Sequence, residues 1–124
     1  VGEGAWLGHT PISVSTQKDA GQSVLATGFP VQFEFKSSSI QNFFQITQRF
    51  KKTRMLGSAA MSLAYVACGR MDAYWEENIL FWDVAAGAAL VKAAGGWISL
   101  KSTGRSPYAY QVSCASARKL FFEM

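Results

Sequence analysis

Histidine, cysteine and acidic residues are scarce in this sequence. Its 124 residues include one histidine, two cysteines and eight Asp or Glu side chains. The histidine, His9, falls on a predicted loop tip with no Asp, Cys or second His beside it, so we assign it no catalytic role. No CxxC pair, phosphate-binding P-loop or GxGxxG motif is present either. These absences argue against a zinc site, a serine or cysteine hydrolase and the common nucleotide-binding folds.

Long apolar runs are absent as well. No stretch reaches the roughly 20 apolar residues that a membrane-spanning helix needs, and no secretory segment is visible. Half of the residues are apolar (49%) and 16% are charged, which is typical of a globular chain. We therefore expect a soluble, cytoplasmic protein that forms a single domain over residues 1–124. Cys68 and Cys114 fall in a predicted helix and a predicted strand, and we expect buried thiols rather than a disulfide.

The formal net charge of +4 could indicate a nucleic-acid partner. The basic residues are scattered, however, apart from one cluster at a predicted helix end, made of Arg49, Lys51, Lys52 and Arg54. Positive side chains are favoured at helix C-termini by the helix dipole. No aromatic and basic stacking motif accompanies the cluster. We therefore predict a local structural role for it, and no nucleic-acid or membrane partner.

Hydrophobic periodicity and turn residues predict strands that alternate with helices. The predicted strands cover residues 5–7, 11–15, 24–27, 52–56, 72–75, 97–100 and 110–114. The predicted helices begin at the capping serines 37–39, at Gly57 and Ser58, at Asp83, and near Ser116. Short connections between such elements favour an α/β fold, a layered sandwich of a mixed β-sheet with flanking helices.

The helix predicted between Asp83 and the pair Gly95-Gly96 organises the rest of the chain. It begins at an acid, ends at two glycines that can supply a left-handed cap, and is built almost entirely of small or apolar residues. A helix that is apolar all round is normally buried on more than one side. Taken alone, Asp83 is expected to be the N-cap of this helix.

The helix start at Gly57 and Ser58 has a similarly small, apolar body. Gly57 has no side chain, so a ligand oxygen could approach the free N–H groups of the first turn, where the helix dipole favours electron-rich atoms. The structural alternative is that Ser58 is an N-cap and that the following alanines pack tightly. We predict that the two helix starts, marked by Ala59 and Asp83, open at the same edge of the sheet.

Three stretches of the sequence carry a family resemblance. Trp82-Asp83 followed by x-Ala-Ala-Gly, with Ala-Gly-Gly at 94–96, is similar to the second signature of the inositol monophosphatase family. Residues 54–60 and 65–76 have the family's spacing from Gly57-Ser58 to Glu76 and on to Asp83. Residues 2–30 resemble the stretch that follows the family's first signature. The resemblance therefore covers nearly the whole chain.

The resemblance implies a magnesium-dependent phosphatase that acts on phosphomonoesters such as inositol phosphates. It implies that Asp83 is a ligand of Mg²⁺. It assigns the substrate side of the site to four residues: Gly57, Ser58, Ala59 and Glu76. In the family, the backbone at Ala59 faces the substrate hydroxyls and Glu76 hydrogen-bonds one of them. The alternative for Glu76, which we prefer for Glu77, is an ordinary exposed acid at a strand end.

Parts of the family pattern are missing. The Glu and the Asp-Pro-[Ile/Leu]-Asp-Gly-[Thr/Ser] signature that complete the family's metal site occur nowhere in this sequence. Both would lie upstream of Val1, and the sequence begins as though something upstream were missing. Ala93 stands where the family usually has a Glu before Ala-Gly-Gly, which bears on stability or neighbouring contacts rather than on the family. We therefore assign no catalytic residue.

Two interpretations fit these observations. In the first, the chain is the C-terminal, substrate-side part of a phosphomonoesterase and is not active alone. In the second, it is a free-standing, non-catalytic module for assembly or for weak polyol or phosphate binding. The retention of Gly57, Glu76 and Asp83 favours the first interpretation, whereas Ala93 and the missing carboxylates favour the second. Whether the chain is an enzyme is left open by the sequence.

The resemblance also bears on partners. In the family, the upstream half would cover apolar side chains that here lack a cover, with candidates Trp6, Phe29, Phe33, Phe35 and Trp97. Contiguous apolar patches larger than a few hundred Å² are rare on monomers. We therefore predict a homo-oligomer, most simply a twofold dimer, or association with a missing N-terminal half, and a small polyol phosphate as ligand.

Overall fold

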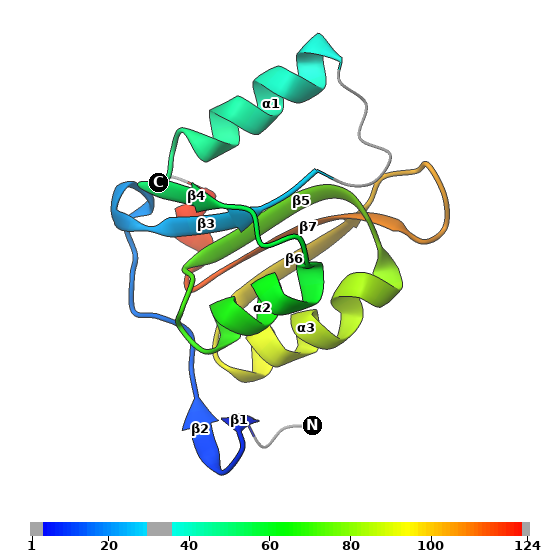
Figure 1. Cartoon of the computed structure of the whole chain (residues 1–124). Helices are drawn as coiled ribbons and strands as arrows, with labels where there is room; N and C mark the ends of the chain where they lie inside the picture. Colours follow the sequence, from blue (N-terminus) through cyan, green and yellow to red (C-terminus); the bar gives the residue numbers. More distant parts are fainter. Residues whose placement is uncertain (1–3, 30–35, 123–124) are drawn as a thin grey trace.

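A mixed five-stranded sheet forms the centre of the molecule (Figure 1). The computed structural model describes residues 4–29 and 36–122. The strand order is β4 (Lys52–Arg54), β3 (Val24–Thr27), β5 (Ala73–Leu80), β7 (Ala109–Ala115) and β6 (Trp97–Ser102). Strands β4, β3 and β5 are parallel, whereas β7 runs antiparallel to both β5 and β6. The sheet is thus mixed, as predicted.

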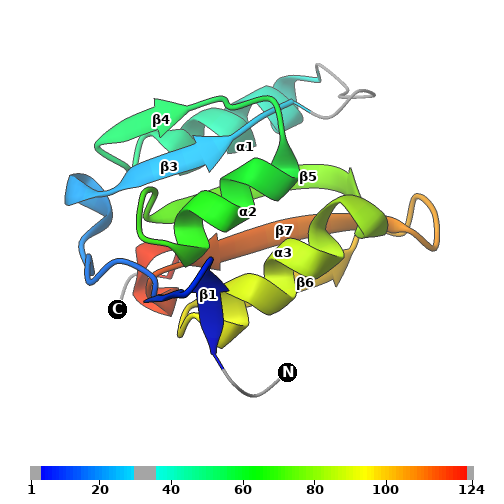
Figure 2. The ribbon, with the colours of Figure 1, turned by 60° about the horizontal axis from the view of Figure 1, so that its bottom comes forward.

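Helices cover both faces of the sheet. Helix α1 (Ser37–Thr47) lies on one face, and α2 (Ala59–Ala67) and α3 (Phe81–Ala93) lie side by side on the other (Figures 1 and 2). Side chains alternate along β5, so Tyr74 packs into the core under α2 and α3 while Ala73 and Trp75 join the core under α1. The predicted α/β sandwich of a mixed sheet with flanking helices is confirmed.

Four short elements complete the described fold. Strands β1 (Ala5–Leu7) and β2 (Thr10–Ile12) form an antiparallel hairpin apart from the main sheet (Figure 1). Two 3₁₀ turns, η1 (Ala20–Gln22) and η2 (Arg118–Leu120), precede β3 and follow β7. The prediction of a helix beginning near Ser116 is wrong, because only the 3₁₀ turn η2 forms there among the described residues. Strands β2 and β4 also end earlier than predicted, at Ile12 and Arg54.

The starts of α1 and α3 differ from the prediction. Lys36 occupies the N-cap position of α1 without a side-chain hydrogen bond, and the serines 37–39 lie inside its first turn. The N-cap position of α3 is Leu80, so Asp83 is not an N-cap but a first-turn residue. The cause is strand β5, which runs on to Leu80 and passes directly into the helix.

The basic cluster does not close a helix as predicted, because α1 ends at Thr47 and Lys52 already lies in β4. Arg49 instead donates hydrogen bonds to the carbonyl oxygens of Leu120 and Phe121, the latter pair at 2.5 Å. A guanidinium carries several donors in a fixed geometry and suits neighbouring carbonyls. Arg49 therefore has a structural role, but the predicted local role is wrong, because it holds η2, which is distant in sequence, rather than its own helix.

Both cysteines are free thiols, as expected, but only Cys114 is buried as predicted. Cys114 is fully buried in β7, and burial raises the pKa of its thiol. Cys68 is half-buried at the C-terminal end of α2. Among the described residues, no helix is long and apolar enough to cross a membrane.

Helices α2 and α3 approach each other closely at Gly87. A Cβ atom added at Gly87 would lie 2.5 Å from Cβ and 2.6 Å from Cδ1 of Leu63, a fully buried residue of α2. Side chains in a packed core cannot retreat from such an overlap without strain. Gly87 is therefore required by the contact with α2, although glycine is unfavourable inside a helix.

We predict that Gly87→Ala destabilises the protein by about 1–3 kcal/mol through overpacking. In a Leu63→Ala background the same change should be less destabilising but still unfavourable, because the overlap with Cδ1 is removed while the Cβ atom of residue 63 stays 2.5 Å from the added methyl group. Chemical denaturation of the wild type, both single variants and the double variant measures this coupling. Equal effects of Gly87→Ala in the two backgrounds would contradict the close contact.

Candidate functional site

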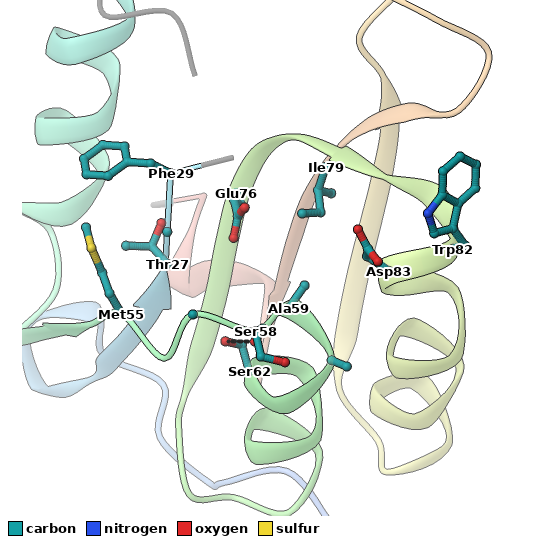
Figure 3. Close-up of a pocket in the computed structure, with 13 residues that line it drawn as sticks. Thr27, Phe29, Met55, Ser58, Ala59, Ser62, Glu76, Ile79, Trp82 and Asp83 are labelled. Carbon is teal, nitrogen blue, oxygen red and sulfur yellow. Dashed lines mark hydrogen bonds between the residues drawn. The ribbon is translucent and has the colours of Figure 1, made fainter. Parts of the chain in front are cut away.

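A pocket of about 620 Å³ opens at one edge of the sheet, on the side covered by α2 and α3 (Figure 3). Its lining includes all five residues predicted from the sequence, Gly57, Ser58, Ala59, Glu76 and Asp83. They come from three elements: the turn into α2, the middle of β5 and the first turn of α3. The structure therefore gathers the predicted site residues in one place.

The topology explains why these residues meet. Strands β3 and β4 are parallel, so their carboxyl ends lie at the same edge and bring Thr27, Gly28 and Met55 to the pocket. Helices α2 and α3 both begin at this edge, as predicted. In open α/β sheets this edge is the usual place for ligands. Two helix N-termini pointing at one pocket also make it favourable for a negatively charged group.

The first turn of α2 combines a glycine turn with a serine cap. Gly57 has φ of +76°, in the left-handed region where a side chain would be strained. The Ser58 hydroxyl accepts a hydrogen bond from the Met61 N–H at 3.2 Å, so Ser58 is the N-cap of α2. The capping alternative is thus correct for the Ser58 side chain. The backbone N–H of Ala59 remains at the pocket, as a first-turn donor that the helix itself does not use.

Glu76 lies in the pocket but is not a strand-end residue. Strand β5 continues beyond it, and its side chain is 8% exposed. The Tyr74 hydroxyl donates a hydrogen bond to Glu76 Oε1 at 2.8 Å. Burial raises the pKa of the Glu76 carboxyl, the hydrogen bond from Tyr74 lowers it, and the negative charge of Asp83 raises it further. The interpretation of Glu76 as an ordinary exposed acid is wrong.

A β-bulge follows Glu76. Glu76 pairs with Val112 and Ile79 with Tyr110, so β5 has one residue more than β7 across this interval, and Asn78 adopts φ of +54°. The extra residue shifts the alternation and brings Ile79 to the same pocket as Glu76.

Glu77 lies within the bulge, but its side chain faces α1 on the opposite side of the sheet. It is half-buried, and its Oε1 accepts a hydrogen bond from Asn42 of α1 at 2.7 Å. Glu77 is therefore outside the pocket, as predicted, but it is a tether to α1 rather than an exposed acid.

Asp83 projects from the first turn of α3 on the far side of the pocket from Thr27 and Phe29 (Figure 3). Its side chain is exposed, and in the part of the chain that the structure describes no hydrogen bond engages it. A carboxylate near a helix N-terminus is stabilised by the helix dipole. Asp83 is thus an exposed carboxylate that lines the pocket.

The described residues alone do not fit a magnesium site. Magnesium prefers octahedral oxygen ligands and is commonly held by carboxylates together with waters and substrate phosphates. Within residues 4–29 and 36–122, no group of three or more His, Cys, Asp or Glu side chains could hold a metal ion. Of the two acids at the pocket, Glu76 is also occupied by Tyr74. Asp83 is therefore the one exposed carboxylate that this pocket offers among the described residues.

Sequence reasoning missed several residues that line the pocket, and one, Tyr74, that supports it from the core. Thr27 is the last residue of β3, Gly28 follows it, and Met55 follows β4. Their position at the carboxyl ends of parallel strands could have indicated that they line the pocket. Tyr74 was missed because the predicted strand ended at residue 75. Its contact with Glu76 can be expected only when β5 continues past Glu76, so that both side chains lie on one face. Ile79 could not be predicted, because the bulge turns its side chain to the face of the sheet that regular alternation would not give it.

Comparison with known proteins agrees with this geometry. The model of the inositol monophosphatase family matches residues 1–122. The chain is 43% identical over 98 residues to the Nus factor SuhB of Xylella fastidiosa, covering 78% of this chain and 36% of that protein. It is 42% identical over 97 residues to an inositol-1-monophosphatase of Synechocystis, covering 77% and 34%.

A solved structure shows the same fold. The inositol monophosphatase from Anabaena (Nostoc) sp. PCC 7120 superimposes with a TM-score of 0.78 at 33% identity, over 96% of this chain and 48% of that chain. This chain thus spans about a third of the length of the two relatives and about half of the solved structure. From the match over residues 1–122 and these likenesses, the chain belongs to the inositol monophosphatase family.

Proposed function

We propose that the chain supplies the substrate-side wall of a phosphomonoesterase site, and that it binds a small polyol phosphate without hydrolysing it alone. The observation that carries the proposal is the convergence of two helix N-termini, Glu76 and Asp83 on one pocket. Membership of the inositol monophosphatase family supports the choice of ligand.

Each part of the pocket suits one part of such a ligand. The first-turn N–H groups at Ala59 and the dipoles of α2 and α3 favour negative or electron-rich oxygens. The Glu76 carboxylate, when ionised, can only accept hydrogen bonds, so it favours a ligand hydroxyl. Asp83 would supply one carboxylate to Mg²⁺, the ion that the family implies. Magnesium supplies charge neutralisation and water activation in phosphoester hydrolysis when a complete site holds it.

The proposal of inactivity follows from the acids that are present. The pocket has one exposed carboxylate, and a Mg²⁺ ion needs several oxygen ligands, so other groups would have to supply most of them. The relatives are longer than this chain, so the remaining ligands would come from a part of the protein outside these residues, which we propose to be an N-terminal half. The substitution at Ala93 is compatible with either interpretation, because Ala93 is exposed and outside the pocket.

Exposed apolar side chains support a partner for this chain. Trp6 is 55% exposed and Phe29 46% exposed, although Phe29 stacks on Phe43. Trp97 is better covered than predicted, because it is half-buried against Phe121 and Phe122. Phe33 and Phe35 lie outside the described residues.

The layer of α2 and α3 adds exposed apolar groups that the sequence did not single out. Met61 is 47% exposed on α2, and Trp82 is 61% exposed at the start of α3. The small sheet of β1 and β2 packs on this layer through Ala5, yet Met61 and Trp82 stay exposed, so we propose that a partner packs there, either a second copy or the N-terminal half.

We predict that the purified chain binds myo-inositol 1-phosphate weakly, with a roughly millimolar dissociation constant, and releases no phosphate above background in the presence of Mg²⁺. Ala59→Pro should weaken binding about tenfold or more, because it removes a first-turn donor to a charged ligand. Proline is well tolerated at the first helical position, and Ser58 before it is already extended. Calorimetry and a phosphate-release assay measure the two quantities.

The matched control is Ser37→Pro, which removes the equivalent N–H of α1 on the other face of the sheet and follows an extended Lys36. It should leave binding unchanged. Absence of binding by the wild type, or equal effects of both proline variants, would overturn the proposed pocket. Phosphate release that is abolished by a chelator and by Asp83→Asn would overturn the proposed inactivity.

We also predict a homodimer in solution when no other partner is present. Burying apolar surface contributes on the order of 25 cal/mol per Å², so a shared apolar face favours association. Met61→Glu should shift the chain toward monomer, whereas Phe44→Gln, a change at a 55% exposed residue of α1, should not. Sedimentation velocity over a wide concentration range is the measurement. A wild type that stays monomeric throughout, with a cooperative melt, would refute the prediction.

A further inference from the structure

Tyr74 and Glu76 form a hydrogen-bonded pair on one face of β5. They are two residues apart on the strand, so both point toward the layer of α2 and α3. The Tyr74 ring is completely buried in the core beneath these helices. Its hydroxyl donates to Glu76 Oε1 at 2.8 Å. A tyrosine with a fully buried ring thus holds one carboxylate oxygen.

Gly28 places a second constraint on the same carboxylate. A Cβ atom added at Gly28, at the end of β3, would lie 3.1 Å from Oε1, 3.6 Å from Cδ and 4.0 Å from Oε2 of Glu76. The contact to Oε1 would be tighter than ordinary van der Waals contact, so the backbone of Gly28 closes in on the oxygen that Tyr74 already holds. The added Cβ would lie farther from Oε2, and among the described residues no hydrogen bond uses that oxygen.

The chemistry of the pair determines what Oε2 can bind. The Tyr74 hydroxyl has one proton, and that proton is directed at Oε1. An ionised carboxylate offers only acceptors, so a group that meets Oε2 must be a donor, such as a ligand hydroxyl. Burial raises the pKa of the Glu76 carboxyl, and the hydrogen bond from Tyr74 opposes this rise by stabilising the charged form, which is the better acceptor.

We propose that Tyr74 is a positioning residue, which with Gly28 orients Glu76 so that Oε2 accepts a hydrogen bond from a ligand hydroxyl and the pocket prefers polyol phosphates to phosphates of plain ring alcohols. The inference rests on the proposed function, because it assigns the basis of ligand selection at the same pocket. It concerns two residues that contribute no acid or metal ligand of their own.

The test compares two phosphomonoesters, myo-inositol 1-phosphate and cyclohexyl phosphate, which share a six-membered ring and a phosphate but differ in ring hydroxyls. In the wild-type chain the inositol ester should bind more tightly. Tyr74→Phe, which keeps the ring and removes the hydroxyl, should reduce this preference roughly three- to tenfold, the range expected for one hydrogen bond. Binding of cyclohexyl phosphate should not change.

Gly28→Ala is a second, independent variant for the case that Tyr74→Phe fails to fold. Gly28 does not have a positive φ, so alanine fits its backbone, and the added Cβ should displace the carboxylate and reduce the same preference. The matched controls are Tyr110→Phe, at a half-buried tyrosine of β7, and Gly21→Ala, at an exposed glycine whose added Cβ would meet only Asp19 at 3.4 Å. Both should leave the preference unchanged.

The pH dependence separates positioning from a merely structural role. In the wild type the preference for the inositol ester should fall as the pH is lowered through the pKa of Glu76, because the protonated carboxyl is a poorer acceptor. Tyr74→Phe should move this fall to higher pH, since the hydrogen bond that lowers the pKa is gone while burial and Asp83 still raise it. Taking the ratio of the two esters cancels the titration of their common phosphate group.

The outcomes are distinguishable. If neither ester binds the wild type, the proposed function fails. If both esters bind but Glu76→Gln, Tyr74→Phe and Gly28→Ala all leave the preference unchanged, the pocket stands and the positioning inference is overturned. Loss of the preference in Glu76→Gln alone also overturns the role of Tyr74 and Gly28. Loss in all three variants, with the pH shift in Tyr74→Phe, supports the inference.

Discussion

The bulge in β5 between Glu76 and Ile79 is the constraint on which the pocket depends. Without the extra residue, Ile79 would face the other side of the sheet, and the strand would enter α3 in a different direction. With it, Glu76, Ile79 and the first turn of α3 all reach one pocket. Asn78 takes the left-handed conformation that this geometry requires, and asparagine accepts that conformation more readily than most residues. A local irregularity in one strand therefore brings the two acids of the pocket together.

Much of the fold was predictable because its signals are local. The glycine and serine before α2 and the two glycines after α3 mark helix ends through backbone conformation and capping, which depend on few neighbours. The small, apolar bodies of both helices indicated buried packing, and the structure places them side by side. The predicted site residues likewise followed from short motifs with fixed spacing, and the pocket contains all five of them.

The sequence could not predict features that depend on pairing across the sheet. The register of β5 against β7 determines where the bulge falls, and with it the end of the strand and the position of Asp83 within the first turn of α3. The tie between Arg49 and η2 spans more than seventy residues and has no local signal. The burial of Glu76, and the tyrosine beneath it, likewise appear only when α2, α3 and the sheet are assembled.

The close contact between Gly87 and Leu63 affects the spacing of α2 and α3 as well as the stability of the fold. Because the two helices are in close contact there, this contact determines how far apart their N-termini lie at the pocket. A bulkier residue at Gly87 would splay the helices and separate Ala59 from Asp83 without altering either of them. The width of the pocket is thus determined partly by a half-buried glycine that does not line it, and it could be varied in steps by substitutions at that single position.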